Sequence, residues 1–293
     1  MLKFYLFFIT NLSLSQSHFI FDSETKKPVP FTNILYLKEE SIIDRDYCNE
    51  IGLFTIKTNI SFDKITFSCV GYETKSVDNF SNIDIIYLIK KSILLDEVII
   101  SKNKNTNFSI LGFSKSKKKT RLSAYKGFEI VVFIDNPFNQ PKDVQSFLFK
   151  VKNDQKFKTA VRVHFYKKDL EKLIPSEEIL NEDIIKFIEG GTKELIEVDV
   201  SKYELELPIE GAFIGIEWLG AIDEKSGEFI TDKTIWSATY IEVNDKINQP
   251  LTFIRSKFNN HKWENTENMK VEVKKYIEYK NYPNASFGIK IFN

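Results

Sequence analysis

Short apolar runs separated by polar breaks follow one another along the chain after residue 16, and none keeps the 3.6-residue period of a helix. In one run Ile65, Phe67 and Cys69 alternate with mostly polar residues, which is typical of a strand with one buried face. Gly52 and Gly71 mark turns, because glycine accepts backbone angles that other residues avoid. In this part we predict strands at 19–21, 31–37, 41–47, 53–57, 65–70, 83–89 and 98–100.

The same pattern continues in the second half of the chain, where apolar runs again end at turn residues such as Asn136 and Pro137. Segments 169–174 and 183–188 are long enough for only one helical turn each, and we expect them to connect sheets. The set predicts an all-β fold with a two-sheet, jelly-roll-like sandwich here. The strands are expected at 128–135, 144–151, 160–166, 195–200, 212–219, 234–243, 251–258 and 287–292.

The length of 293 residues favours two domains, since an average domain has roughly 100–200 residues. Between the two sets of strands the apolar pattern thins into a basic stretch, 115–121, which is typical of an extended, solvated tether. Within it, 110–113 could pack back as a short strand. The predicted organisation is a leader at 1–16, a first β domain at 17–101, a basic linker at 102–126 and a second β domain at 127–293.

The charge balance argues against non-specific binding of polyanions. Lys and Arg together number 41, and Asp and Glu together also number 41, so the formal net charge is zero. No global field therefore draws the protein to nucleic acid or an anionic membrane. The two cysteines, Cys48 and Cys69, leave two alternatives open: a disulfide in an oxidising compartment, or two small buried side chains.

The N-terminus predicts export. Lys3 precedes a short apolar run, and the small residues Ser13 and Ser15 are those that a signal peptidase reads, so we expect cleavage before Gln16. The alternative, a membrane anchor, is disfavoured because the run is much shorter than the roughly 20 residues that span a bilayer. No transmembrane segment is expected after cleavage. The predicted location is the periplasm, the outer-membrane surface or the medium.

Several motifs of the first domain follow one another in a set order. They lie at 20–34, with Lys27-Pro28-Val29-Pro30, at 49–56 around Gly52, at 67–73 around Gly71-Tyr72, and at 95–100. This ordered set resembles the carboxypeptidase-regulatory-like domain of exported bacterial proteins. The resemblance implies a transthyretin-like β-sandwich. Because members of this family are accessory modules, it also implies binding or structural support and brings no catalytic residues.

Polar residues on strands of the second domain form the candidate site. Alternation puts Arg162, His164 and Tyr166 on one face of their strand, and Glu217 lies in an otherwise apolar strand. If these faces converge, a carboxylate beside Arg162 forms a strong bidentate pair. The candidate ligand-binding residues are Arg162, His164, Tyr166, Asp199, Glu217, Trp218 and Trp236, with Trp263 as a further stacking surface.

Three interpretations of this cluster remain open. The first is a buried ion pair that sets strand register, and the second is a binding face for a carbohydrate, a peptide or an envelope protein. The third is a secreted hydrolase that uses His164, Asp199 and Glu217. His18, His164 and His261 are scattered, and no phosphate loop or nucleophile motif occurs, so no metal and no cofactor is predicted. We therefore expect a non-enzymatic, exported binding or structural accessory protein, whose oligomeric state the sequence leaves open.

Overall fold

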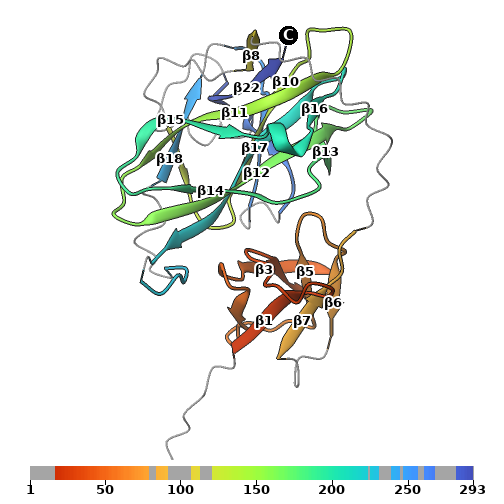
Figure 1. Ribbon diagram of the computed structural model, residues 1–293, viewed down its shortest axis with the longest axis vertical. Coiled ribbons are helices and arrows are strands. Elements are labelled where there is room, and N and C mark those ends of the chain that lie inside the picture. Colours follow the sequence, from red (N-terminus) through yellow and green to blue (C-terminus); the bar gives the residue numbers. More distant parts are fainter. Residues whose placement is uncertain are drawn as a thin grey trace, which may run out of the picture.

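The computed structural model confirms the all-β class (Figure 1). It describes residues 17–78, 84–91, 107–112, 121–223, 225–230, 239–244, 247–256, 261–267 and 282–292. Strands in four sheets account for most of these residues, with one 3-10 turn at Ser201–Tyr203. The predicted leader, the predicted strand at 98–100 and Trp236 lie outside the described residues.

Residues 17–91, which we call the N-terminal module, form two facing sheets. Ile20, Ile34 and Phe67 are among the buried residues of the core between them. One sheet has the order β4 (Leu53–Thr55), β1 (Ser17–Asp22) and β7 (Ile85–Leu88), with β1 and β7 parallel. The other has the order β3 (Ser41–Tyr47), β2 (Asn33–Lys38), β5 (Lys64–Ser68) and β6 (Lys75–Val77).

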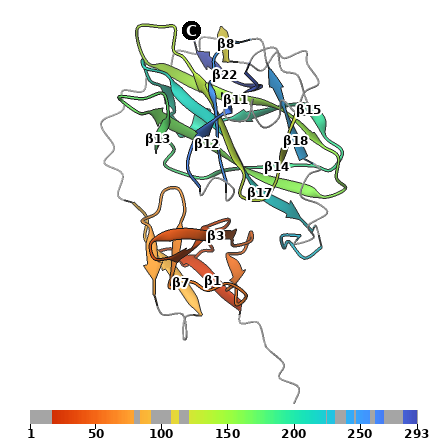
Figure 2. The same cartoon turned by 180° about the vertical axis from the view of Figure 1, so that it is seen from behind.

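Residues 107–292, the C-terminal module, form two larger sheets that face each other across a second core (Figures 1 and 2). Seven strands make the first: β13 (Pro175–Glu178), β12 (Lys158–Lys168), β17 (Ala212–Ile222), β10 (Glu129–Ile134), β19 (Thr252–Arg255) and β20 (Glu264–Asn265), with β14 (Ile184–Ile188) also on β12. Eight make the second: β21 (Asn284–Ala285), β18 (Thr239–Asn244), β11 (Lys142–Asn153), β22 (Phe287–Phe292) and β8 (Phe108–Gly112), with β15 (Lys193–Asp199), β16 (Glu206–Leu207) and β9 (Arg121–Ala124) off this path.

Two segments differ from the expectation. The segment 183–188 was expected to be a helical turn, but it contains strand β14, which pairs with β12 from Thr159 to Val163. Its apolar residues do not alternate because both of its faces are covered: Ile184 packs into the core of the C-terminal module, and Ile185 packs toward the N-terminal module. The second is β9, which falls inside the predicted linker but belongs to the eight-stranded sheet. The short strand expected at 110–113 is present as β8, which joins the same sheet.

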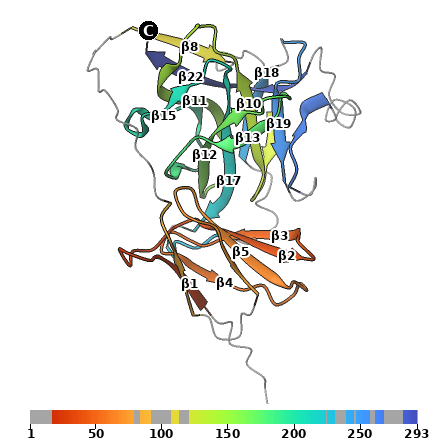
Figure 3. The same ribbon diagram turned by 90° about the vertical axis from the view of Figure 1, so that its right-hand side faces the viewer.

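The two modules are docked through an apolar cluster. Phe31 and Tyr47 of the N-terminal module are buried with Ala160, Leu219 and Ile222 of the C-terminal module. Figure 3 shows β2 and β3 on the side of the N-terminal module that faces β17, with β1 and β4 on the opposite side. The outer face of the seven-stranded sheet is therefore covered in part by a second module.

Gly71 is required at this junction. It has φ +80°, and a Cβ added there would overlap the backbone oxygen of Asn181 in the C-terminal module. Gly52, with φ +75°, plays the corresponding part within the N-terminal module, where a Cβ would lie 2.5 Å from the Ile20 oxygen. Both turn glycines are thus fixed by close backbone approaches.

Cys48 and Cys69 are buried free thiols, which settles the alternative left open by the sequence. In the register of β2 with its neighbours, Asn33 lies between Tyr47 of β3 and Ser68 of β5. The next residues, Cys48 and Cys69, therefore lie two strand spacings apart, about 10 Å. A disulfide needs Cα atoms closer than about 7 Å, so these cysteines cannot pair in this fold.

Candidate functional site

A row of four charged residues crosses the outer face of the seven-stranded sheet. Strand register places Arg162 on β12 beside Glu217 on β17, and Glu217 beside Glu129 on β10. Glu129 in turn lies beside Arg255 on β19. Each arginine binds the neighbouring glutamate, with Arg162 Nη1 2.8 Å from Glu217 Oε2 and Arg255 Nε 2.6 Å from Glu129 Oε2. Two like charges in the middle of the row are thus flanked by two cations.

His164 lies against both glutamates of this row. Its Nε2 is 3.5 Å from Glu217 Oε2 and 4.0 Å from Glu129 Oε1. Its Nδ1 is 2.6 Å from Glu178 Oε2, which β13 supplies. Burial opposes the imidazolium, but Glu129 and Glu178, with the hydrogen bond to Glu217, outweigh it and raise the pKa of His164 to about 10. The side chain is therefore a cation that offsets the repulsion between adjacent glutamates.

Gly215 lies opposite His164 across the strand pair and also faces Val131 of β10. A Cβ at Gly215 would overlap the Ile130 carbonyl oxygen, so β17 and β10 approach too closely for any side chain here. The position between Phe213 and Glu217 on the outer face is consequently left without a side chain. This is a local requirement for glycine at the centre of the row.

The N-terminal module supplies the remaining partners of Glu217. Tyr47 donates its hydroxyl to Glu217 Oε1 at 2.6 Å, and Arg45 Nη1 lies 2.8 Å from the same oxygen. Arg162 also reaches across the junction, because its Nη2 donates to the Phe31 carbonyl oxygen. Burial disfavours the Glu217 carboxylate, but the hydrogen bond from His164 and the charges of Arg162 and Arg45 hold its pKa well below the usual range.

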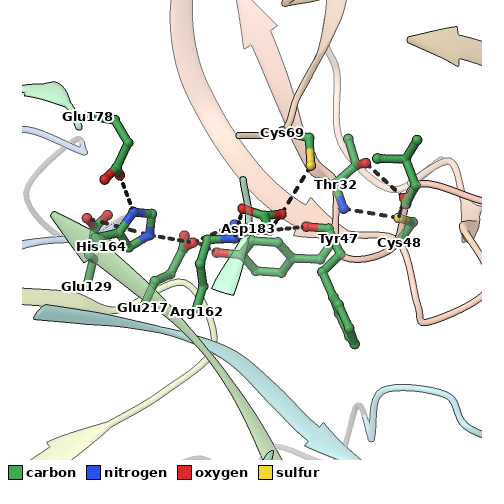
Figure 4. Close-up of polar contacts among 12 residues, drawn as sticks. Thr32, Tyr47, Cys48, Cys69, Glu129, Arg162, His164, Glu178, Asp183 and Glu217 are labelled. Atoms are coloured by element: carbon green, nitrogen blue, oxygen red, sulfur yellow. Dashed lines mark hydrogen bonds and ion pairs between the residues drawn. The ribbon is translucent and has the colours of Figure 1, made fainter. Parts of the chain in front are cut away.

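Asp183 extends the network to a cysteine of the N-terminal module (Figure 4). Its Oδ1 lies 3.0 Å from Arg162 Nε, and the Cys69 thiol donates to its Oδ2 at 3.1 Å. Burial and the neighbouring carboxylate of Asp183 raise the pKa of Cys69 well above its usual value. The thiol is thus a hydrogen-bond donor here, and a thiolate nucleophile is disfavoured.

The network is balanced in formal charge. The basic side chains are Arg45, Arg162, His164 and Arg255, and the carboxyl groups are Glu129, Glu178, Asp183 and Glu217. Arg162, Glu217, Glu129 and His164 are at most 5% exposed. Among the described residues, no group of three or more His, Cys, Asp or Glu side chains is arranged to hold a metal ion. The arrangement is that of a closed ionic network between two modules.

The structure brings together four of the residues singled out in the sequence, Arg162, His164, Tyr166 and Glu217. Tyr166 donates its hydroxyl to Glu129 Oε1 at 2.7 Å and lies 3.0 Å from His164 Nδ1. Trp263 packs edge-on against Tyr166, and the guanidinium of Arg255 lies 4.4 Å from the centroid of its ring. The polar faces of these strands therefore converge, which is the condition that the sequence left open.

Two other candidates lie elsewhere. Asp199 ends β15 in the eight-stranded sheet, where it is exposed and accepts hydrogen bonds from Ser201. It does not reach His164 or Glu217, because alternation shows which face of a strand a residue occupies but not which sheet the strand joins. Trp218 points to the opposite face from Glu217 and is buried in the core beside Phe128.

Six residues of the network were not singled out in the sequence: Arg45, Tyr47, Glu129, Glu178, Asp183 and Arg255. One of them carried a usable signal. Glu129 is the second residue of the apolar run 128–135 and, by alternation, shares a face with Val131 and Phe133, as Glu217 does with Phe213. A buried charge needs an oppositely charged or hydrogen-bonding partner. Two apolar strands that each carry one glutamate therefore predict that cations lie beside both glutamates.

Comparison with known proteins assigns no family. No protein-family model and no curated protein sequence matches the chain. A crystal structure of the cysteine protease and lectin-like domains of Cwp84, a surface-layer-associated protein of Clostridium difficile, is similar with a TM-score of 0.40 and 12% identity over 88% of this chain. The clostridial cysteine protease Cwp84 after propeptide cleavage gives 0.41 and 12% over 90%. This chain spans 50% and 66% of those two chains, and likeness at this level assigns neither fold nor function.

Within the described part of the chain, no helix has the length and apolar character needed to cross a bilayer.

Proposed function

We propose that this chain is an exported, non-enzymatic accessory protein of the cell envelope, with a carboxypeptidase-regulatory-like N-terminal module that braces a larger β-sandwich. The signal-peptide pattern of residues 1–16 and the motifs around Gly52 and Gly71 support export and the family resemblance. Its role is to bind or support an envelope component. No step of covalent chemistry is part of the proposal.

The observation that carries this proposal is the closed state of the ionic network. Both carboxylate oxygens of Glu217 are engaged, Oε1 by Arg45 and Tyr47, and Oε2 by Arg162 and His164. A hydrolytic carboxylate has to face a substrate and a water molecule in an open site. Since Glu217 faces only other side chains of this chain, the network supports a role in holding the modules together.

The rival function, hydrolysis of a glycan or peptide by the face that carries His164 and Glu217, makes a different prediction for one variant. We expect Glu217→Gln to lower the midpoint of thermal unfolding, because the amide cannot balance Arg45 and Arg162. No hydrolysis of polysaccharide or peptide libraries is expected from either protein. Hydrolysis by the wild type that Glu217→Gln abolishes at unchanged stability would overturn the proposal.

Export is tested separately. In cells that make the full chain, N-terminal sequencing of the mature protein is expected to start at Gln16, in the periplasmic, outer-membrane or medium fraction. Lys290→Met is the control for expression level, since it removes only a surface ion pair with Glu197 and leaves the leader unchanged. An uncleaved protein retained in the cytoplasm would contradict this part of the proposal.

A further inference from the structure

The outer face of the three-stranded sheet in the N-terminal module is apolar. On β1, Ile20 and Asp22 are buried toward the module core, so Phe19 and Phe21 point outward. On β7, Ile86 and Leu88 point inward, and Ile85 and Tyr87 point outward. A sheet face in contact with water usually carries polar side chains, so an outer face lined by Phe19, Phe21, Ile85 and Tyr87 is unusual.

Strand register makes these side chains neighbours. Phe19 lies beside Ile85 on one side and Leu53 on the other, and Phe21 lies beside Tyr87. The rings of Phe19 and Phe21 are nearly parallel, with an interplanar angle of 14° and centroids 5.9 Å apart. Four of the residues on this face or at its ends, Ile51, Ile85, Tyr87 and Ile89, are between 38% and 56% exposed. We call this set the aromatic face.

The C-terminal module does not cover the aromatic face. Arg45 and Tyr47, which dock against Glu217, lie on β3 in the other sheet of the N-terminal module. In Figure 3, β1 and β4 lie on the side away from the C-terminal module. The face is therefore directed outward, away from the ionic network.

Amino groups border the aromatic face. Lys26 Nζ lies 4.3 Å from the centroid of the Tyr87 ring and donates to the Ser23 carbonyl oxygen. Lys75 Nζ donates to the Tyr87 carbonyl oxygen at 3.1 Å. Within the described part of the chain, neither amino group forms an ion pair with a carboxylate. Both can therefore pair with an anion from outside the chain.

The size of the face decides between kinds of partner. Three strands spaced about 4.8 Å apart and up to six residues long give a face of roughly 200–300 Å². A stable protein interface or dimer buries about 800 Å² per partner, so the face is too small for either. It is wide enough for an extended chain of sugar rings, whose apolar C–H faces pack on aromatic side chains.

We propose that the aromatic face binds a polysaccharide that carries carboxylate groups. The sugar rings stack on Phe19, Phe21 and Tyr87, and the carboxylates lie at Lys26 and Lys75. This inference rests on the proposed function as an envelope binding protein and names its ligand class. It also places the binding surface on the N-terminal module, away from Arg162 and Glu217.

The test is affinity electrophoresis of residues 17–293 in gels that contain polygalacturonate, alginate or hyaluronate, with dextran and methyl-esterified polygalacturonate as uncharged probes. We expect at least one anionic polysaccharide to retard the wild type and the uncharged probes to have no effect. We expect the double variant Phe21→Ala and Tyr87→Ala to weaken retardation at least about tenfold, since burying one ring is worth more than about 1.4 kcal/mol. A second double variant, Lys26→Glu and Lys75→Glu, is expected to weaken it as much, because it replaces attraction of the carboxylates by repulsion.

Phe108→Ala is the matched control, because Phe108 lies on β8 of the other module and is 42% exposed, close to the 38% of Tyr87. It is expected to leave retardation unchanged, and circular dichroism checks that every variant is folded. If Phe21→Ala unfolds the protein, Tyr87→Ala and the lysine variants still decide the question. Three results overturn the proposal: no retardation by any anionic probe, retardation that survives every face variant, or a dimer that Tyr87→Ala abolishes. None of them bears on the Glu217→Gln test.

Discussion

At the scale of single residues, the fold places more charge inside the protein than its apolar strands lead one to expect. Arg162 is fully buried. Its guanidinium forms ion pairs with Glu217 and Asp183 and donates a hydrogen bond to the Phe31 carbonyl oxygen. Removing one partner of a buried ion pair leaves the other charge uncompensated, which costs more than the pair itself contributes. Individual residues of the network are therefore critical to stability.

Arg162→Met is expected to lower the free energy of unfolding by about 3–5 kcal/mol, because Asp183 and Glu217 lose a buried cation. The measurement is urea denaturation at neutral pH. Lys290→Met is the control, since Lys290 pairs with Glu197 on the surface, where a pair is worth less than about 1 kcal/mol. Equal losses in the two variants would contradict the buried role of Arg162.

His164 predicts how stability depends on alkaline pH. Its folded-state pKa of about 10 lies above the ordinary value of 6.5, so its contribution is fully present below pH 6.5 and is lost as pH rises through about 10. We expect the wild type to lose stability between pH 7 and pH 10.5 in urea titrations. His164→Gln should remove most of that dependence, and an unchanged pH profile in this variant would refute the assignment.

At the scale of elements, the sequence predicted the face that a side chain occupies on its strand, but not which strands pair or which faces are buried. Alternation correctly put Arg162 and His164 on one face of β12 and set Glu217 apart from Trp218 on β17, because the face that a residue occupies is local to its strand, whereas the pairing of the two strands is not. Strand β14 was missed, since an element covered on both faces has no alternation to detect. Burial of the face could not be predicted either, because Tyr47 lies 170 residues before Glu217 in the chain.

The close approach of β17 and β10 makes a prediction at this scale. Gly215→Ala would drive a Cβ into the Ile130 carbonyl group, so we expect a loss of about 3 kcal/mol or more in urea denaturation. Gly191→Ala is the comparison, because Gly191 has φ +80° but open space around it, and only backbone strain of about 1–2 kcal/mol is expected. A Gly215 variant as stable as the Gly191 variant would show that the strands can separate.

At the scale of the whole molecule, docking joins two β modules into one unit. The junction combines the apolar cluster around Phe31 and Tyr47 with the ion pair between Arg45 and Glu217. An interface that contains both a packed apolar centre and buried charges fixes one relative orientation of its two sides. The modules are therefore expected to exchange amide hydrogens at the junction slowly and together.

Gly71→Ala tests this coupling. The added Cβ meets the Asn181 backbone across the junction, so hydrogen exchange is expected to become faster in β3 and also in β14 of the other module. Gly52→Ala is closely matched, because its φ is also positive but its Cβ meets Ile20 within the N-terminal module. We expect it to affect the N-terminal module alone, and identical exchange patterns in the two variants would argue against rigid docking.

The two thiols on either side of Thr32 have a consequence for how the protein matures. A chain that crosses into an oxidising compartment with two cysteines risks joining them before its strands have assembled, and here the finished fold has no place for that bond. In an exported chain, β2 would have to pair with β3 and β5 before the thiols are oxidised, because its place between these strands keeps the two thiols apart in the folded protein. The stability of the folded protein would then be independent of the redox environment, because the fold contains no disulfide between these cysteines.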